Sequence, residues 1–380
     1  VPSGIAPSLA LSTRESRSLR LIARRTWRFF ETFVDDEEHA LPPDNYQEDP
    51  EPVRAHRTSP TNMGLYLLSV MSAHDFGWIG AQDTADRLEA TLQTMADLYR
   101  VQGHFCNWYD TLTLSPLEPI YISTVDSGNL AGHLISLAQA CRELAHRRPF
   151  GPETLAGVGD AVHLVLESLE GAGPPRFEDR VAAGQLREGA EEILAVLKGP
   201  PTAGAAWARR LEDLGSRAER LVDIASSLTD NGGDLSTTEV LAWAKAVRDT
   251  VRSHARDIET ALLLERVEVK ARAETILGHH FSDLAMRAEA MVQAMDFRFL
   301  FDTSRKLFSI GYRVADHMLD PSCYDLLASE ARLASFVAIA KGDVLPRHWF
   351  RLGRALTPVG RGAALVSWSG SMFEYLMPLL

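Results

Sequence analysis

The sequence has 380 residues, of which 46% are apolar, and its formal net charge is −12. This length and composition predict a globular protein with a substantial core in one large or two medium domains. The negative charge disfavours nucleic acids as partners, because phosphate binding relies on clustered Lys and Arg, and it equally disfavours anionic membranes. A neutral sugar polymer fits this charge better. No apolar run approaches the roughly 20 residues that span a bilayer.

Helical periodicity dominates the first part of the chain. Strand-like alternation is rare, and the short stretch Ile120–Val125 is its best candidate. Helices with one apolar face are predicted over Ser18–Val34, over Gln82–Gln102 (through Leu88, Leu92, Met95 and Tyr99) and over Leu130–Leu144. The sequence therefore predicts a mainly α class.

Residues 147–295 differ in composition, because they are rich in Ala, Leu, Glu and Arg and poor in aromatics. Breaks at Gly171–Pro175, Gly199–Pro201 and Asn231–Gly233 predict three or four long helices here. We expect this stretch to be an inserted bundle that serves as scaffold or partner surface. Residues 1–146 and 296–380 are then the two parts of one interrupted module.

Polar clusters precede several of the predicted helices. Ordinary N-capping explains one polar residue at each helix but not the additional Arg, Asn and aromatic residues. Helices of alternating direction would bring every second N-terminus to one face, where sugars can bind through hydrogen bonds and ring stacking. The clusters are Arg57–Asn62 before Met63–Ser72, Thr124–Asn129 before Leu130–Leu144, Pro321–Asp325 before Leu326–Ala340, and Ser367–Ser371 before Met372–Leu380.

The segment Gly103–Asp110 carries Trp108 and Tyr109 between Asn107 and Asp110. It predicts a stacking platform beside hydrogen-bonding groups, or alternatively a buried aromatic anchor with satisfied polar tips. The Pro-containing loop Leu41–Asp49 resembles the rim of a site, and its acidic residues either cap the chain or contact ligand.

Glycoside chemistry requires a protonated carboxylic acid and a second carboxylate. Glu374 is the candidate acid, because Phe373 and Tyr375 provide the apolar surroundings that raise a pKa. The alternative is an ordinary acidic residue near a helix N-terminus. Glu330 and Arg332 are expected inside a helix, as an internal ion pair or a pocket wall. Asp126 and Asp302 are further carboxylates that could equally be caps.

Other chemistries have little support in the sequence. The pair His279-His280 has no third ligand at a metal spacing, so no metal site is predicted. There is no glycine-rich phosphate loop and no Gly-x-Ser-x-Gly turn. Three widely spaced cysteines, Cys106, Cys141 and Cys323, are expected to be free thiols.

Together these motifs resemble the glycoamylase-like middle region of cyclic β-1,2-glucan synthases. The resemblance covers residues 20–145 and 296–380. The motifs that carry it are Arg25–Phe33, Leu41–Asn45, His56–Tyr66, Asn107–Asp110, Val125–Leu130, Tyr324–Arg332 and Phe373–Leu376. The start without Met and the end inside an apolar segment lead us to expect a fragment.

The resemblance implies an (α/α)6 barrel of the six-hairpin toroid type, here incomplete and interrupted by an inserted helical bundle. It implies retaining transglycosylation that closes linear β-1,2-glucan into a ring. The region itself would need no cofactor, whereas a membrane-embedded glycosyltransferase domain of the same parent chain would use UDP-glucose. A phosphorylase-like domain would follow, and the region would lie at the cytoplasmic face of an inner-membrane protein.

Carried over to this chain, the resemblance makes Glu374 the general acid/base, with the second carboxylate expected beyond Leu380. The alternatives are an inverting endo-β-1,2-glucanase and a non-catalytic helical scaffold between transferase and phosphorylase domains. The glucan cleft is predicted to be lined by Arg57, Thr58, Asn62, Asn107, Trp108, Tyr109, Asp110, Asp126, Ser127, Asn129, Tyr324, Asp325, Glu330, Arg332 and Trp368.

Overall fold

The computed structural model describes residues 11–147, 151–171, 179–199, 205–230, 235–265 and 270–376. This part of the chain is mainly helical, which confirms the predicted class. The chain divides into two compact units, and each is described by itself. The bundle unit comprises 1–29, 72–84 and 148–276, and the site unit comprises 30–71, 85–147 and 277–380.

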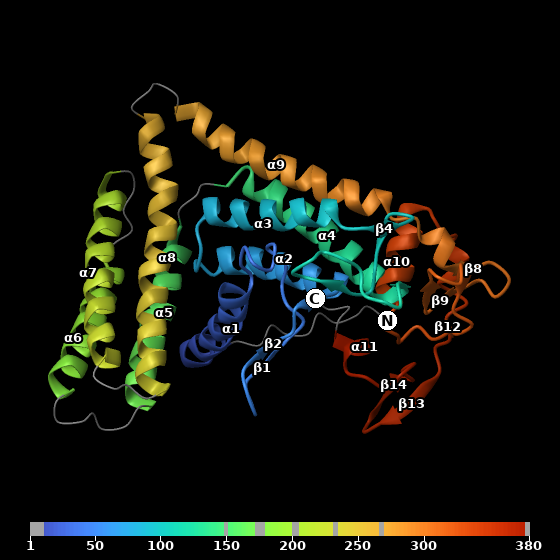
Figure 1. The fold of residues 1–380 in the computed structure, drawn as a ribbon, viewed down its shortest axis with the longest axis horizontal. Helices are drawn as coiled ribbons and strands as arrows, with labels where there is room; N and C mark the ends of the chain where they lie inside the picture. Colours follow the sequence, from blue (N-terminus) through green and yellow to red (C-terminus); the bar gives the residue numbers. More distant parts are fainter. Residues whose placement is uncertain are drawn as a thin grey trace. The chain divides into compact units, whose positions relative to one another are not determined.

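The helices carry most of the structure, and Figure 1 shows their order along the chain. The short 3-10 helices are η1 (Phe297–Leu300) and η2 (Pro346–His348). The α-helices are α1 (Thr13–Phe33), α2 (Pro60–Asp75), α3 (Ala81–Asp97), α4 (Thr124–Leu144), α5 (Pro152–Gly171), α6 (Arg180–Leu197), α7 (Ala205–Asp230), α8 (Leu235–Glu265), α9 (Lys270–Ala294), α10 (Arg332–Lys341) and α11 (Phe373–Leu376).

The strands are short, and each described pair is antiparallel. The sheets have the orders β1-β2, β3-β6, β4-β5, β11-β10-β7, β12-β9-β8 and β13-β14. The strands are β1 (Tyr46–Gln47), β2 (Val53–Arg54), β3 (Arg57–Thr58), β4 (Arg100–Val101), β5 (His104–Phe105), β6 (Tyr109–Asp110), β7 (Tyr121–Ser123), β8 (Phe301–Asp302), β9 (Leu307–Ser309), β10 (Gly311–Arg313), β11 (Met318–Leu319), β12 (Cys323–Tyr324), β13 (Leu356–Val359) and β14 (Gly362–Leu365).

In the bundle unit, α8 packs against α5 and α7, and α6 packs against α7. Their apolar faces form one core in which Trp243 and Leu214 are fully buried. Arg24 of α1 is also buried, with its guanidinium 5.5 Å from the ring centre of Trp243 and 5.8 Å from that of Trp78. Among the described residues, no helix is long and apolar enough to cross a membrane.

The middle of the chain contains more helices than predicted. Within its described residues, 147–295 holds five helices, α5 to α9, instead of three or four. Most of the residues of the three predicted breaks lie outside the described ranges. One boundary was not predicted because the sequence around the end of α8 and the start of α9 contains no Pro or Gly to mark it.

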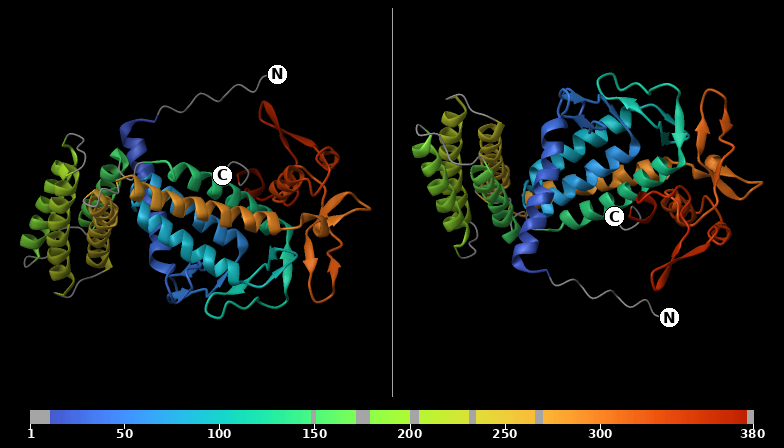
Figure 2. Two further views of the ribbon diagram at one scale, coloured as in Figure 1. Left: turned by 90° about the horizontal axis from the view of Figure 1, so that it is seen from above. Right: turned by 90° about the horizontal axis from the view of Figure 1, so that it is seen from below.

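In the site unit, α4 lies against α10, and glycine permits the close approach. A Cβ atom on Gly128 would lie 2.5 Å from the Cβ atom of Ala334, so no larger residue fits at this crossing. Gly64 of α2 has the same function toward α4, since its Cβ would lie 2.3 Å from His133 Nδ1. Figure 2 shows the strands β8 to β12 at the end of the site unit where α4 begins. These close contacts bring helix starts and hairpins to one end of the unit.

Several predicted boundaries are wrong. The helix α3 ends at Asp97 because the chain turns into the β4–β5 hairpin, which leaves Tyr99 exposed and outside the helix. The helix predicted from Leu326 begins only at Arg332, so Glu330 precedes the helix and does not lie inside it. The helix predicted over Met372–Leu380 is described only as Phe373–Leu376, and residues 377–380 lie outside the described ranges.

Candidate functional site

The first turns of α2 and α4 present polar side chains to each other. Pro60 opens α2, where its missing N–H costs no hydrogen bond, and the hydroxyl of Ser59 accepts from the Asn62 amide at 3.2 Å. The hydroxyl of Ser123 caps α4 in the same way by accepting from the Asp126 amide at 3.2 Å. Because backbone caps are already provided, the side chains of Asn62 and Asp126 are available for other contacts.

Asp126 makes the central contacts between the first turns of α2 and α4. Its Oδ1 accepts from Thr61 Oγ1 at 2.5 Å, and its Oδ2 accepts from the amide of Asn107, oriented to suit both neighbours, at 2.8 Å. Burial raises the pKa of Asp126 above its ordinary value, although hydrogen bonds from Thr61 and Ser123 oppose this shift. Asp126 is thus a partly buried carboxylate that hydrogen bonds hold in place.

Two further predicted residues of α4 are buried beside it. Asn129 donates from Nδ2 to Thr61 Oγ1 at 3.2 Å, and its Oδ1 has no hydrogen-bond partner among the described residues. Ser127 Oγ lies 2.8 Å from His104 Nδ1. Burial lowers the pKa of His104 to about 4, so this imidazole is neutral at physiological pH.

Arg57 and Trp108 extend the hydrogen-bond network of Asp126 beyond Asn107 toward Asp44. The Arg57 guanidinium donates to Asp44 Oδ2 at 2.9 and 3.2 Å and lies 4.9 Å from the Trp108 ring centre. Trp108 Nε1 in turn donates to the Asn107 oxygen at 3.0 Å. Asn62 donates to Asp44 Oδ1 at 3.3 Å. A continuous chain of contacts therefore joins Asp44 to Asp126 through an aromatic ring.

Three predicted residues have local contacts that differ from this network. Tyr109 is buried, and its hydroxyl donates to the Tyr99 carbonyl at 2.6 Å. Asp110 closes a turn by accepting from the amides of residues 112 and 113. Thr58 is buried in β3, with a hydroxyl that has no described hydrogen-bond partner. For Tyr109 the buried-anchor interpretation describes the geometry better than a stacking platform.

A second group of predicted residues gathers around Tyr324 in β12. Its ring packs with Val125 and Ala331 in a small apolar cluster, and its centre lies 4.8 Å from that of Trp368. Burial raises the pKa of Tyr324 well above its ordinary value. The charges of three predicted carboxylates also raise it, in the order Glu330, Asp126 and Glu374. Tyr324 therefore lies within electrostatic range of both groups of site residues.

Glu330 and Arg332 contact the C-terminal segment rather than each other in the described contacts. Glu330 Oε1 accepts from Ser371 Oγ at 2.9 Å, and Arg332 Nη2 is 3.5 Å from the carbonyl oxygen of Glu374. Burial lowers the pKa of Arg332. Asp325, the neighbour of Tyr324, is exposed.

Glu374 is fully buried, but its surroundings are not those expected of a general acid. Burial raises its pKa, yet donors from the preceding loop outweigh burial and bring the pKa below its ordinary value. These donors are the Ser367 hydroxyl and the amides of Ser369, at 2.9 Å, and Gly370, at 3.0 Å. The prediction of a pKa raised by apolar neighbours is therefore wrong for this conformation.

Two residues of the network were not among the predicted site residues. The sequence alone leaves Asp44 open between capping and ligand contact, and Thr61 lies within the motif His56–Tyr66 without an assigned role. Thr61 is adjacent to the predicted Asn62, and Asp44 belongs to the acidic loop Leu41–Asp49, which are the signals that the sequence offers for them. Within the described residues, no group of three His, Cys, Asp or Glu side chains could hold a metal ion.

Comparison with known proteins confirms the resemblance found in the motifs. The chain is 45% identical to the cyclic β-(1,2)-glucan synthase NdvB of Rhizobium meliloti (strain 1021) over 98% of its own length. It spans only 13% of the length of that curated relative. No protein-family model matches the chain.

Proposed function

We propose that this chain is a carbohydrate-active module that acts on β-1,2-glucan, and that the network from Asp44 to Asp126 is part of its glucan-binding surface. The single observation that carries the proposal is that Arg57, Trp108 and Asp126 are joined by ring stacking and hydrogen bonds, in a chain similar to a glucan synthase. Amide, carboxylate and guanidinium groups beside an indole match the hydroxyls and apolar faces of sugars.

The network runs from exposed to buried side chains, as expected of a site that binds part of a longer polymer. Half of the Arg57 side chain is exposed and Trp108 is half-buried, whereas Asn129 at the other end is buried. The Arg57 guanidinium covers one face of the Trp108 ring, so a sugar would stack on the other face or displace the guanidinium. The pairing of Arg57 with Asp44 limits that displacement.

In the proposed chemistry, Glu374 is the general acid/base of a retaining transglycosylation that closes the glucan into a ring. To donate a proton, its carboxyl must first be protonated, and the donors from Ser367–Gly370 oppose this. Substrate binding would therefore have to open this loop. The proposed fold for the module is an (α/α)6 barrel, with the second catalytic carboxylate outside this sequence.

A non-catalytic scaffold is the second candidate function. The observation that favours it is the lowered pKa of Glu374, since a carboxylate held by three loop donors is suited to fixing a turn. An endo-β-1,2-glucanase would need the same general acid, so the state of Glu374 does not favour it over transglycosylation. Partnership with glycosyltransferase and phosphorylase-like domains, and a place at the cytoplasmic face of a membrane, remain part of the proposal.

The experiment that separates these functions is a substitution in the complete parent protein. Glu374→Gln should abolish ring formation while linear glucan still accumulates, whereas the control Glu143→Gln, at an exposed carboxylate of α4 outside the predicted cleft, should keep ring formation. Ring formation at the wild-type rate in Glu374→Gln would contradict the catalytic assignment and support the scaffold. Transferred or cyclic products in the wild type would distinguish transglycosylation from hydrolysis, which yields linear oligosaccharides with new reducing ends.

A further inference from the structure

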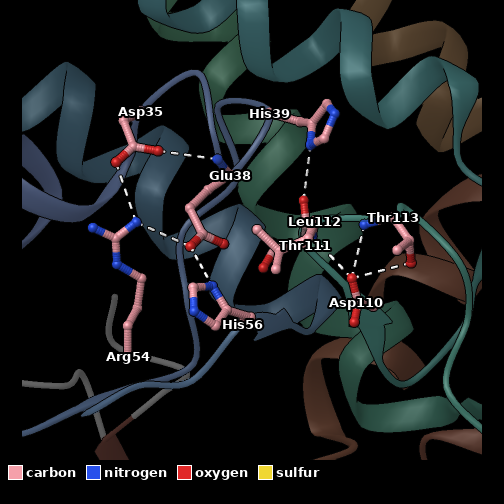
Figure 3. A network of polar contacts seen from close by, with 9 residues as sticks. All are labelled: Asp35, Glu38, His39, Arg54, His56, Asp110, Thr111, Leu112 and Thr113. Atoms are coloured by element: carbon pink, nitrogen blue, oxygen red, sulfur yellow. Dashed lines mark hydrogen bonds and ion pairs between the residues drawn. The ribbon is translucent and has the colours of Figure 1, made fainter.

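The buried carboxylate of Glu38 lies close to the candidate site, although Glu38 is not one of the predicted site residues. Glu38 is fully buried, and its Oε1 accepts from Arg54 Nη1 at 3.0 Å and lies 2.6 Å from His56 Nδ1. Figure 3 shows the side chains of Arg54 and His56 directed at the same carboxyl group of Glu38. Its other oxygen, Oε2, is buried and has no hydrogen-bond partner among the described residues.

The side-chain partners of Glu38 come from residues 54–56, which directly precede Arg57 in the chain. Arg54 belongs to β2, and His56 immediately precedes Arg57 at the start of β3. The Arg57 amide donates to the Ala55 carbonyl at 2.7 Å, which closes a tight turn centred on His56 between the two strands. At such a turn the side chains of His56 and Arg57 can point to different sides. The contacts agree with this, since His56 reaches Glu38 whereas Arg57 reaches Asp44 and Trp108.

The backbone of this segment is held on both sides. The Asp44 amide donates to the Arg57 carbonyl at 2.7 Å, and the Thr111 amide donates to the His56 carbonyl at 3.2 Å. These bonds hold the backbone of residues 56 and 57, and further contacts act on the side chains of residues 54 and 56. Glu38 supplies those contacts from the loop that also carries Asp44.

We propose that Glu38 is a positioning residue of the glucan site, which orients Arg57 by anchoring Arg54 and His56 on the other side of the same segment. The inference rests on the proposed function. An unpaired buried carboxylate oxygen is costly for stability, and such departures are expected where a side chain serves a site. Asp35 strengthens the anchor by accepting from the same Arg54 nitrogen at 3.1 Å.

A double-mutant cycle in this chain tests the inference. Binding of linear β-1,2-glucan is measured by titration calorimetry for the wild type, Glu38→Gln, Arg57→Ala and the double variant. If Glu38 acts through Arg57, Glu38→Gln weakens binding about tenfold alone and not at all when Arg57 is already Ala. An equal loss in both backgrounds, or no loss in the wild type, would overturn the inference.

Controls separate positioning from folding. Asp35→Asn is the matched variant, because Asp35 contacts Arg54 but not His56, and it should change binding less than Glu38→Gln. If Glu38→Gln fails to fold, His56→Ala repeats the cycle at a side chain that is 42% exposed. A correctly folded His56→Ala that binds like the wild type would also overturn the inference.

One readout needs no glucan. The NMR resonance of the Arg57 Nε–H group, assigned with Arg57→Lys, should shift in Glu38→Gln because the guanidinium changes its place over the Trp108 ring. An unchanged resonance would contradict the positioning role. If the wild type does not bind the glucan but the resonance shifts, the proposed function fails and the positioning of Arg57 by Glu38 stands.

Discussion

Thr61 and Asp126 join the first turns of α2 and α4 through a hydrogen bond of 2.5 Å between hydroxyl and carboxylate. They are 65 residues apart in the sequence, and the same hydroxyl accepts from Asn129. One threonine thus connects a carboxylate and an amide that both belong to the predicted glucan cleft. Its removal should disturb the site without touching the core.

Thr61→Val should weaken binding of β-1,2-glucan by about 1–2 kcal/mol, because the buried Asn129 and Asp126 each lose a hydrogen-bond partner. Thr61→Ser keeps the hydroxyl and is the control, with affinity close to that of the wild type. Titration calorimetry on both variants checks this. Equal affinities for Thr61→Val and the wild type would show that the hydroxyl is irrelevant to the site.

The pKa of Asp126 makes a prediction about stability. Because burial raises this pKa in the folded state, the folded chain holds the proton more tightly than the unfolded chain. The stability of the wild type relative to Asp126→Asn should therefore fall as pH rises through the interval between about 4, the unfolded value, and the higher folded pKa. Above the folded pKa the difference should be constant. Urea unfolding of both proteins between about pH 4 and about pH 7 measures it.

A stability difference that grows with pH would mean that the Asp126 pKa is depressed instead. Asp257 of the bundle unit also has a pKa raised by burial. Because it is present in both proteins, its contribution cancels in the comparison.

Glu374 should show the opposite sign. Its folded pKa lies below its ordinary value, so the carboxylate stabilises the fold above the unfolded pKa, and this stabilisation is lost as pH falls through the folded pKa. Near neutral pH, the free energy of unfolding of the wild type should exceed that of Glu374→Gln by about 1–3 kcal/mol. This difference should disappear only below about pH 4. A gap that already closes near about pH 6 would reveal a raised pKa, as a resting general acid requires.

The bundle unit offers a test of its core. Trp243 is fully buried there, and Trp243→Ala should destabilise the chain by about 3–5 kcal/mol through lost burial and an unfilled cavity. Val181→Ala changes a side chain that is 70% exposed and should have little effect. Thermal and urea unfolding followed by circular dichroism compare the two variants, and similar stability would contradict the described core.

The sequence was sufficient for the helical class and for part of the network. Asn107, Trp108 and Asp126 were predicted as site residues, and the structure brings them into direct contact. Their signal was an excess of polar and aromatic groups beyond what helix capping requires. Gly64 and Gly128, in the same motifs, carry no ligand chemistry and instead allow helices to approach closely.

Other features depend on tertiary contacts that periodicity does not encode. Glu330 falls outside α10 because residues 326 and 328 form bridges with Gly353 and Ser367, which replace helical hydrogen bonds. The apolar neighbours of Glu374 were visible in the sequence, but its pKa is set by a turn that brings the Ser367 hydroxyl and two amides to the carboxylate. Glu38 was missed because an acidic residue among other acidic residues is typical of an exposed loop.

The most direct test of the central claim is titration of this chain with linear β-1,2-glucan, with an α-1,4-glucan of equal length as the control. The account predicts saturable binding of the β-1,2-glucan that is lost in Trp108→Ala and weakened in Asp126→Asn, with no binding of the α-1,4-glucan. Affinity for the β-1,2-glucan that is unchanged in both variants would show that the sugar binds elsewhere and would contradict the account.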